Sequence, residues 1–323
     1  MTKLYFLLFF LFLGMSAYGQ QTPQYSLYML NRFAYNPAYA GMDNSLSITG
    51  SYRKQWVDIP GSPSTYNVSA HLPVYLTNGG FGILLESETL GVNDDTYIGG
   101  AYTYQMDLGR RAVLSIGLGG GLHQRSVDGS RLRTQTGDYS VEQQVITHND
   151  PILPTTRVSG STPTFSAGIY LQTENLEIGF SSLRLAEQTI EFDEFSTQFS
   201  RHYLLSATYG YDLTRKLRLE PSLLLKSNGT QHQTDVSLLA YYNESFLLGG
   251  SYRGYTARSQ DAVVLIAGFN LSEQIRVAYG YDLTLSALNT VGSGSHEVTL
   301  NYNFGRPIGQ GRPPKVIYNP RNL

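Results

Sequence analysis

The chain of 323 residues contains no cysteine, which excludes disulfide bridges, thiolate zinc sites and cysteine nucleophiles. Charged residues are also scarce, at 15% of the chain against roughly 25% in a soluble globular domain. The 23 basic and 25 acidic side chains leave a net charge of −2, so the chain lacks the basic excess of a nucleic-acid-binding protein. We therefore expect no disulfide framework and no bound nucleic acid.

Long apolar runs are missing beyond the first residues. Residues 4–14 are apolar, but the run is too short to cross a bilayer as a helix. Ala17 and Gly19 stand at the −3 and −1 positions of a small-residue cleavage site, which predicts a secretory signal peptide over residues 1–19. A short anchor helix is the less favoured alternative. Since no later run is long enough for a spanning helix, the mature chain is either soluble and exported or held in a membrane as a barrel.

The abundant residues are tyrosine and glycine, at 25 and 33, and much of the chain alternates with a period of two. Near the end, Val298, Leu300 and Tyr302 alternate with polar neighbours. Such a segment has one apolar and one polar face, which is typical of a β-strand. The fourteen segments of this kind cover residues 46–56, 64–75, 79–88, 95–107, 111–124, 163–173, 175–184, 201–213, 216–227, 233–243, 246–255, 260–270, 274–285 and 295–304.

The connections between these segments alternate in length. Those after even-numbered segments are short turns, whereas those after odd-numbered segments are mostly longer, up to residues 125–162. Short turns at one rim and long loops at the other are typical of an outer-membrane barrel with its short turns in the periplasm. A soluble β-sandwich would also alternate, but the loop asymmetry, tyrosines and glycines favour the barrel. We predict an all-β fold: a transmembrane antiparallel up-and-down β-barrel of about fourteen strands over residues 45–304, with both termini periplasmic.

The alternation also sorts the charges. In a barrel the polar face lines the lumen, where opposite charges can pair, whereas Arg or Lys facing lipid at mid-depth would cost about 2–4 kcal/mol. Lys54 falls on the apolar face beside a loop, where its ammonium group could reach water. The charged residues predicted to face the lumen are Arg53, Glu177, Arg218, Glu220, Lys226, Arg276 and Asp282.

No motif for catalysis or metal binding stands out. The six histidines show neither H-x-x-x-H nor H-E-x-x-H spacing, so a local metal site is not supported. Asp94 and Asp95, with His148 and Asp150, fall on predicted outer loops, where some barrels carry hydrolytic groups. Acids in a polar loop are usually only solvated, so we expect no enzyme activity, no cofactor and no metal.

Two flanking segments lack the strand pattern. Residues 20–44 are aromatic and rich in turns, which fits either a periplasmic leader or a plug inside the barrel, since fourteen strands enclose more space than their side chains fill. Residues 305–323 form a tail with four prolines and a charge of +4. This tail is either a disordered extension or an extended periplasmic docking peptide. Its basic residues are Arg306, Arg312, Lys315 and Arg321.

Several short motifs, taken in order, resemble the PorP/SprF family of the type IX secretion system. The resemblance covers nearly the whole mature chain, and the combination is specific although each motif alone is weak. A departure is Asn31-Arg32, where the family more often has Asn-Pro. The matching stretches are residues 23–29 (PQYSLYM), 36–41 (NPAYAG), 52–56 (YRKQW), 60–65 (PGSPST), 69–73 (SAHLP), 221–222 (PS), 250–253 (GSYR), 279–284 (YGYDLT), 292–297 (GSGSHE) and 319–321 (NPR).

The resemblance implies a Bacteroidetes outer-membrane barrel that serves secretion and, in some members, gliding motility. It also implies two kinds of partner: secreted surface proteins with a sorting C-terminal domain, and periplasmic secretion-system or peptidoglycan-binding proteins. The candidate partner-binding residues are Asn36, Pro37, Tyr39 and Gly41 in the N-terminal motif, with Arg306, Arg312, Lys315 and Arg321 in the tail.

The sequence therefore predicts a non-enzymatic barrel in the lipid of the cell outer membrane, which scaffolds or anchors secreted proteins and links them to periplasmic machinery. The alternative is a porin-like diffusion channel for small solutes. An occupied lumen would favour the scaffold, and an open lumen would favour the channel.

Overall fold

The computed structural model describes residues 22–305 except 110, 135–136, 141–144, 149, 194 and 257–258. The predicted signal peptide at residues 1–19 lies outside the described residues, as do Arg306, Arg312, Lys315 and Arg321 of the tail. The described part consists of β-strands and short 3-10 helices, and none of its helices is long and apolar enough to cross a membrane.

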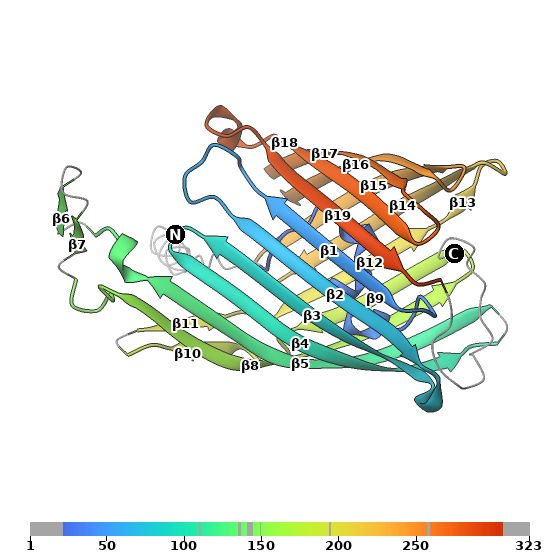
Figure 1. Cartoon of the computed structure of the whole chain (residues 1–323), viewed down its shortest axis with the longest axis horizontal. Coiled ribbons are helices and arrows are strands. Elements are labelled where there is room, and N and C mark those ends of the chain that lie inside the picture. Colours follow the sequence, from blue (N-terminus) through green and yellow to red (C-terminus); the bar gives the residue numbers. More distant parts are fainter. Residues whose placement is uncertain are drawn as a thin grey trace, which may run out of the picture.

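Fourteen antiparallel strands form one closed sheet, which confirms the predicted barrel (Figure 1). Strands that follow one another in this sheet pair in order, and β1 closes the ring against β19, with Ser47 opposite Asn303. A two-residue strand, β13 (Tyr211–Asp212), continues β12 along β14. The fourteen strands are β1 (Ser47–Lys54), β2 (Ser64–Val74), β3 (Gly79–Leu90), β4 (Asn93–Asp107), β5 (Ala112–Asp128), β8 (Arg157–Thr173), β9 (Leu176–Leu183), β12 (His202–Tyr209), β14 (Leu217–Ser227), β15 (His232–Tyr242), β16 (Phe246–Thr256), β17 (Ser259–Asn270), β18 (Ile275–Thr284) and β19 (Ser295–Asn303).

The longer loops contain elements that the alternation did not predict. The long loop is shorter than expected, because β5 extends to Asp128 and β8 already begins at Arg157. Two small hairpins occur at this rim: β6 (Gly137–Ser140) with β7 (Val145–His148), and β10 (Gln188–Glu191) with β11 (Ser196–Phe199). The short helices are η1 (Tyr28–Leu30), η2 (Arg32–Ala34), η3 (Pro37–Tyr39), η4 (Tyr75–Thr77), η5 (Gly129–Arg131) and η6 (Ala287–Thr290).

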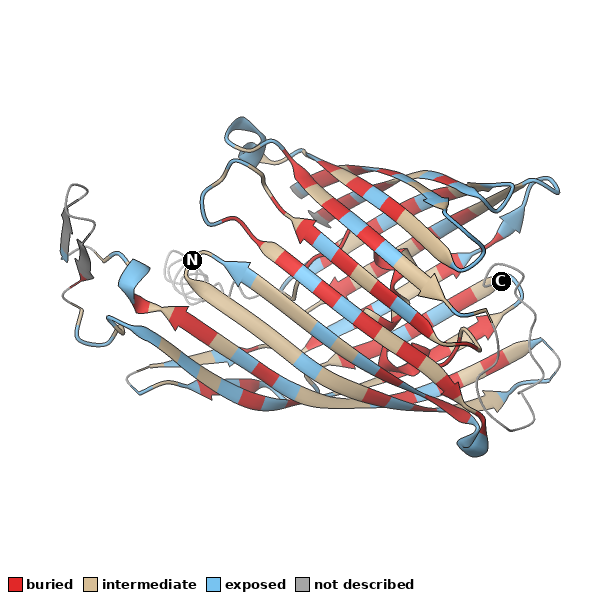
Figure 2. Cartoon of the chain, viewed as in Figure 1, coloured by how far each residue is buried: buried red, intermediate tan, exposed pale blue. Residues whose placement is uncertain are grey.

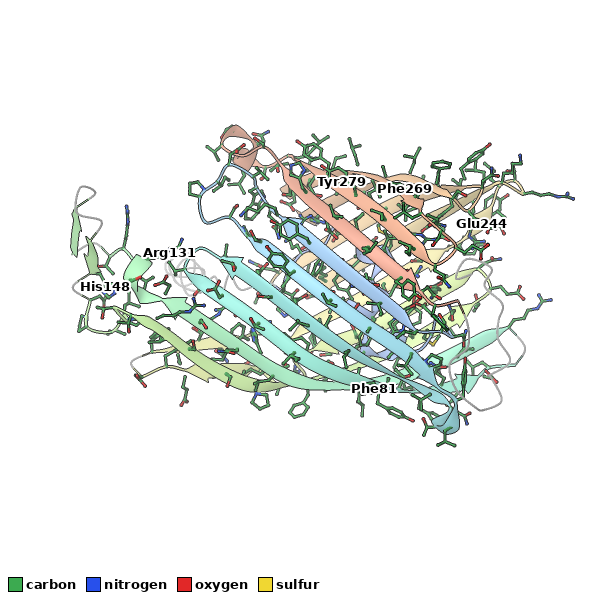
Figure 3. The ribbon with its side chains drawn as sticks, viewed as in Figure 1. Phe81, Arg131, His148, Glu244, Phe269 and Tyr279 are labelled. Atoms are coloured by element: carbon green, nitrogen blue, oxygen red, sulfur yellow. The ribbon has the colours of Figure 1, made fainter. Side chains whose placement is uncertain are left out.

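Burial alternates along each strand, with the polar face turned inward (Figure 2). In β1, for example, Ser51 and Arg53 are buried while Tyr52 is exposed. Large apolar side chains such as Phe81, Phe269 and Tyr279 project from the outer surface (Figure 3). This is the reverse of a soluble β-sandwich, and an apolar outer surface of this extent needs lipid to cover it. All seven charged residues predicted to face the lumen lie on the inward face.

Residues 22–44, which we call the plug, lie inside the barrel. Thr22 borders a small pocket with His202 and Asn228 at the long-loop rim, whereas the plug joins β1 at the short-turn rim. The plug therefore crosses the lumen, and the described ends of the chain, Thr22 and Gly305, lie at opposite rims (Figure 1). The predicted periplasmic position of both termini stays a prediction, because residues 1–21 and 306–323 lie outside the described residues. An even strand count places only the two ends of the barrel wall together.

Candidate functional site: the plugged lumen

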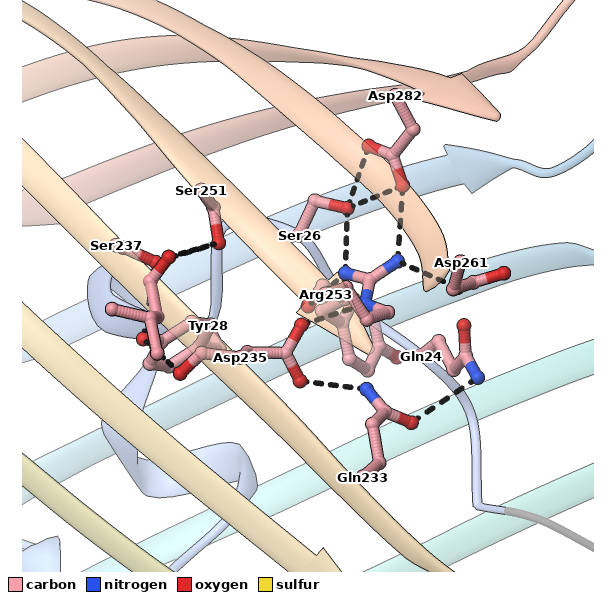
Figure 4. A network of polar contacts seen from close by, with 12 residues as sticks. Gln24, Ser26, Tyr28, Gln233, Asp235, Ser237, Ser251, Arg253, Asp261 and Asp282 are labelled. Carbon is pink, nitrogen blue, oxygen red and sulfur yellow. Dashed lines mark hydrogen bonds and ion pairs between the residues drawn. The ribbon is translucent and has the colours of Figure 1, made fainter. Parts of the chain in front are cut away.

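The first half of the plug is held by Ser26. Its backbone N–H donates to the Glu297 carboxylate at 2.6 Å, and that of Leu27 donates to the same group at 3.2 Å. The Ser26 hydroxyl donates to Asp282 at 2.7 Å and accepts from the guanidinium groups of Arg53 at 2.7 Å and Arg253 at 2.9 Å. The Ser26 side chain thus joins the plug to three buried charged groups, and its backbone N–H adds a fourth; Figure 4 shows the bonds to Arg253 and Asp282.

These charged groups form a wider buried network, which we call the latch. Arg53 pairs with Asp282 at 2.8 Å and with Glu297 at 3.2 Å. Arg253 pairs with Asp235 at 2.6 Å and with Asp282 at 3.0 Å. Each of these five side chains is at most 2% exposed. Burying charge is costly unless it is paired, and both guanidinium groups have well-placed carboxylate partners. The latch therefore depends on the contacts among all its members, including Ser26.

The second half of the plug lies against glycines of the barrel wall. A Cβ atom on Gly117 would stand 2.5 Å from the backbone nitrogen of Ala38, and one on Gly80 would stand 2.7 Å from the Cα of Gly41. Neither wall position can carry a side chain without moving the plug backbone. Within β5 the plug backbone crowds Gly117, whereas a Cβ atom on Gly121 would meet Ile98 and Gly99 of β4 instead.

The predicted site residues of the plug contact the barrel itself. The Asn36 amide donates to the backbone carbonyls of Ile169 and Phe180, and its oxygen caps η3 by accepting from the Ala38 N–H. The Tyr39 hydroxyl donates to Asp43 at 2.7 Å. These contacts place the NPAYAG motif firmly inside the lumen.

The remaining predicted residues of this motif are also enclosed. Pro37 begins η3 and is buried, and the Gly41 N–H donates to Nδ1 of His71 at 3.2 Å. Partner contact at Asn36, Pro37, Tyr39 and Gly41 stays a prediction. Arg32, which stands where the family more often has proline, pairs with Glu177 at 3.0 Å and adds another link between plug and wall.

A third link joins the plug to β3. The Tyr25 hydroxyl donates to Glu86 at 2.7 Å, and Asn31 reaches the same carboxylate through Asn67. Burial, together with the nearby Glu86 carboxylate, raises the pKa of Tyr25 well above its usual range. Tyr25 therefore keeps its proton and remains a donor.

The plug separates two cavities. The larger, about 680 Å³, opens among the short turns and is lined by paired charges that include Arg32, Glu177 and Arg218. The smaller, about 250 Å³, lies on the long-loop side between the plug and strands β3, β4, β5 and β8. The lumen is thus filled at its middle and hollow towards each rim.

A family model described as "Type IX secretion system membrane protein PorP/SprF" matches residues 17–302. The chain belongs to the PorP/SprF family. It is therefore a type IX secretion system membrane protein, as its sequence motifs predict. No curated protein matches the chain.

Solved structures of outer-membrane proteins are similar to this chain at low identity. The Ralstonia pickettii toluene transporter TbuX is 8% identical, with a TM-score of 0.50 over 84% of this chain and 92% of that one. The Acinetobacter baumannii outer membrane protein Omp33 is 6% identical, with a TM-score of 0.44 over 80% of this chain and 98% of that one. Together, the family and the fold place this PorP/SprF barrel in the outer membrane. The PorP/SprF family is a family of secretion-system membrane proteins and not a known enzyme family.

Among the described residues, the groups weighed for hydrolysis have partners other than one another. Asp95 is bonded to Arg125 and His123, Asp94 pairs with Arg157, and His148 contacts the carbonyl of Pro154. Among the described residues, no group of three or more histidines and acids is arranged to hold a metal ion.

The latch was not predicted from the sequence, although its members stand in the motifs that carry the family resemblance. Five separate motifs each contribute one residue: Ser26, Arg53, Arg253, Asp282 and Glu297. In the PorP/SprF barrel these motifs meet at one point, so their joint occurrence was the available signal. Only Asp235, on β15, lies outside the quoted motifs.

Proposed function

We propose that this barrel scaffolds or anchors secreted surface proteins and links them to periplasmic secretion machinery. The observation that carries this proposal is the occupied lumen: residues 22–44 fill the middle of the bore and bond to the wall at Ser26, Asn36 and Gly41. A barrel whose bore is filled offers its rims, rather than its lumen, to other molecules.

The energetics of the latch support a plug that stays in place. Withdrawing Ser26 would leave Arg53 and Arg253 buried with fewer hydrogen bonds, and a hydrogen bond to a charged group contributes about 1.5–3 kcal/mol. The close fit against Gly80 and Gly117 adds packing contacts over the second half. Spontaneous opening should therefore be rare.

In this proposal the two rims have different partners. The long loops hold secreted proteins that carry a sorting C-terminal domain, and the short-turn rim faces periplasmic secretion-system or peptidoglycan-binding proteins. The basic tail follows Gly305 in the sequence, and in this proposal it docks such a partner.

A diffusion channel is the second candidate function. It is favoured by the two cavities of about 680 and 250 Å³, which lie on opposite sides of the plug and extend towards the two rims of the barrel. The similarity to a named toluene transporter shows the fold alone. A channel would require the plug to leave the lumen, which the latch opposes.

Two measurements test the proposal. Co-purification from outer membranes followed by mass spectrometry should recover secreted and periplasmic partners. In planar bilayers the full-length protein should conduct little, and deleting residues 22–42 should raise the conductance. A large, stable conductance of the intact chain would refute the scaffold and establish the channel.

A further inference from the structure

The smaller cavity, on the long-loop side of the plug, has two carboxylates that lie outside the latch, of which Glu86 also holds Tyr25 of the plug. Glu86 and Glu88 point inward from β3 and line this cavity. Glu86 accepts from Tyr25 and Asn67 through Oε2, and Glu88 accepts from Thr65 through Oε1. Within the described residues, Oε1 of Glu86 and Oε2 of Glu88 have no hydrogen-bond partner, and neither carboxylate has a cation within 4.0 Å.

A third acceptor without a partner lines the same cavity. His123 is 4% exposed, and its Nε2 lies 3.1 Å from Asp95. Because an ionised carboxylate can only accept, Nε2 carries the proton and Nδ1 is left as an acceptor. This Nδ1 is buried and has no hydrogen-bond partner among the described residues. An unfilled buried acceptor costs free energy, so its presence beside a cavity points to a donor that enters from outside the chain.

The strand register brings these acceptors together. Glu86 stands opposite Tyr97 on β4, and Tyr97 stands opposite His123 on β5, so the three residues form one row across adjacent strands. Glu88 lies two residues further along β3 on the same face. All three residues line the same cavity.

The charge and lining of the cavity select the class of ligand. Arg125 is bonded to Asp95, so Arg184 alone stands against Glu86 and Glu88, leaving one negative charge in excess. The Arg184 guanidinium is held over the Phe199 ring, 5.0 Å from its centroid. The lining also includes aromatic and apolar side chains such as Phe33, Leu84 and Phe199, together with polar ones such as Asn93 and Thr164. Aromatic walls beside carboxylates suit an organic cation with an apolar stem.

We propose that this cavity binds an alkylammonium group of the kind that a lysine side chain carries. An ammonium has three N–H donors and no acceptor, which matches three open acceptors in a cavity of net negative charge. The cavity volume of about 250 Å³ accommodates a lysine side chain with its four-carbon stem. The group comes either from a polypeptide at the long-loop mouth or from a free amine, and both present the same chemistry. The site is independent of the scaffolding role, because it needs only the cavity.

The test uses purified full-length protein in detergent and ligand-observed NMR titration. The probes are acetyl-Gly-Lys-Gly-amide, the same peptide with norleucine in place of lysine, and n-butylamine. We expect the lysine peptide or butylamine to bind saturably and the norleucine peptide not to bind. The stronger probe identifies the source: the peptide indicates a polypeptide side chain, and butylamine indicates a free amine.

The variants Glu86→Gln and Glu88→Gln keep the side-chain shape and remove the charge. Each should weaken binding about tenfold or more, as expected for a hydrogen bond to a charged group. Glu191→Gln, an exposed acid of β10 at the same rim, is the matched control and should bind as the unaltered protein does. Retained heat-modifiable migration in gels verifies that each variant is folded.

Three results would overturn the inference: no saturable binding of either amine, equal binding of the norleucine peptide, or unchanged affinity in folded Glu88→Gln. None of these bears on recovery of secreted or periplasmic partners. The alkylammonium site and the scaffold can therefore fail separately.

Discussion

Replacing Ser26 by alanine tests whether the latch holds the plug. The substitution removes a hydroxyl that accepts from Arg53 and Arg253 and donates to Asp282, at 2.7 to 2.9 Å. It leaves both backbone N–H bonds to Glu297 in place, and every ion pair of the barrel wall remains. The change therefore acts on plug docking and leaves the wall itself intact.

The expected loss of plug-docking free energy follows from these hydrogen bonds. Hydrogen bonds to charged groups contribute about 1.5–3 kcal/mol net, and the arginine–carboxylate pairs persist, so we take this range for the loss of the hydroxyl as a whole. Because about 1.4 kcal/mol is a factor of ten in an equilibrium constant, the undocked population should rise roughly 10- to 150-fold.

Thiol labelling measures that population. Leu27→Cys introduces a single thiol into a cysteine-free chain at a position that is 1% exposed, so a soluble maleimide reacts only when the plug undocks. The labelling rate should rise by the factor given above when Ser26→Ala is added. Ser245→Ala, which removes an exposed hydroxyl from a short turn, is the matched control and should leave the rate unchanged. If Ser26→Ala labels no faster, the hydroxyl does not hold the plug.

Three further predictions follow from the fold. On whole cells, Thr189→Cys in the β10–β11 hairpin should label and Thr214→Cys should not, because short turns face the periplasm; the opposite pattern would invert the barrel. Gly117→Ala should speed labelling at Leu27→Cys, because its Cβ meets the plug backbone at Ala38. Truncation after Gly305 should leave insertion and heat resistance intact but weaken recovery of periplasmic partners by pull-down; unchanged recovery would contradict docking by the tail.

The barrel wall could be predicted because its information is local. Alternation such as that around Tyr52 and Arg53 follows directly from the pleat of a strand with lipid on one side and a polar lumen on the other. The β10–β11 hairpin escaped prediction, because its strands have only four residues each. Segments that short carry too little alternation to be told from loop.

The contents of the lumen could not be predicted in the same way. The plug consists of short 3-10 turns without a repeating pattern, so the sequence allowed a periplasmic leader equally well. Its main contacts join residues far apart in the chain, as between Ser26 and Glu297. Arg53 and Asp282 could be assigned to the lumen by their phase, but phase does not say which charges meet. Only the folded barrel brings them to one point.

Because the plug crosses the lumen and is attached to β1 at one rim, withdrawal of the plug differs between the two directions. The plug is tethered to β1 at the short-turn rim, where Leu46 leads into Ser47, and it extends to Thr22 at the opposite mouth. If the plug were pulled from the short-turn side, the residues nearest β1 would leave the wall first. Asp43 and Tyr39 would therefore lose their contacts early, and Ser26 would leave the latch near the end. A pull from the long-loop side would work against the tether. The tether therefore allows complete withdrawal of the plug only towards the short-turn rim, the side on which the chain enters its first strand.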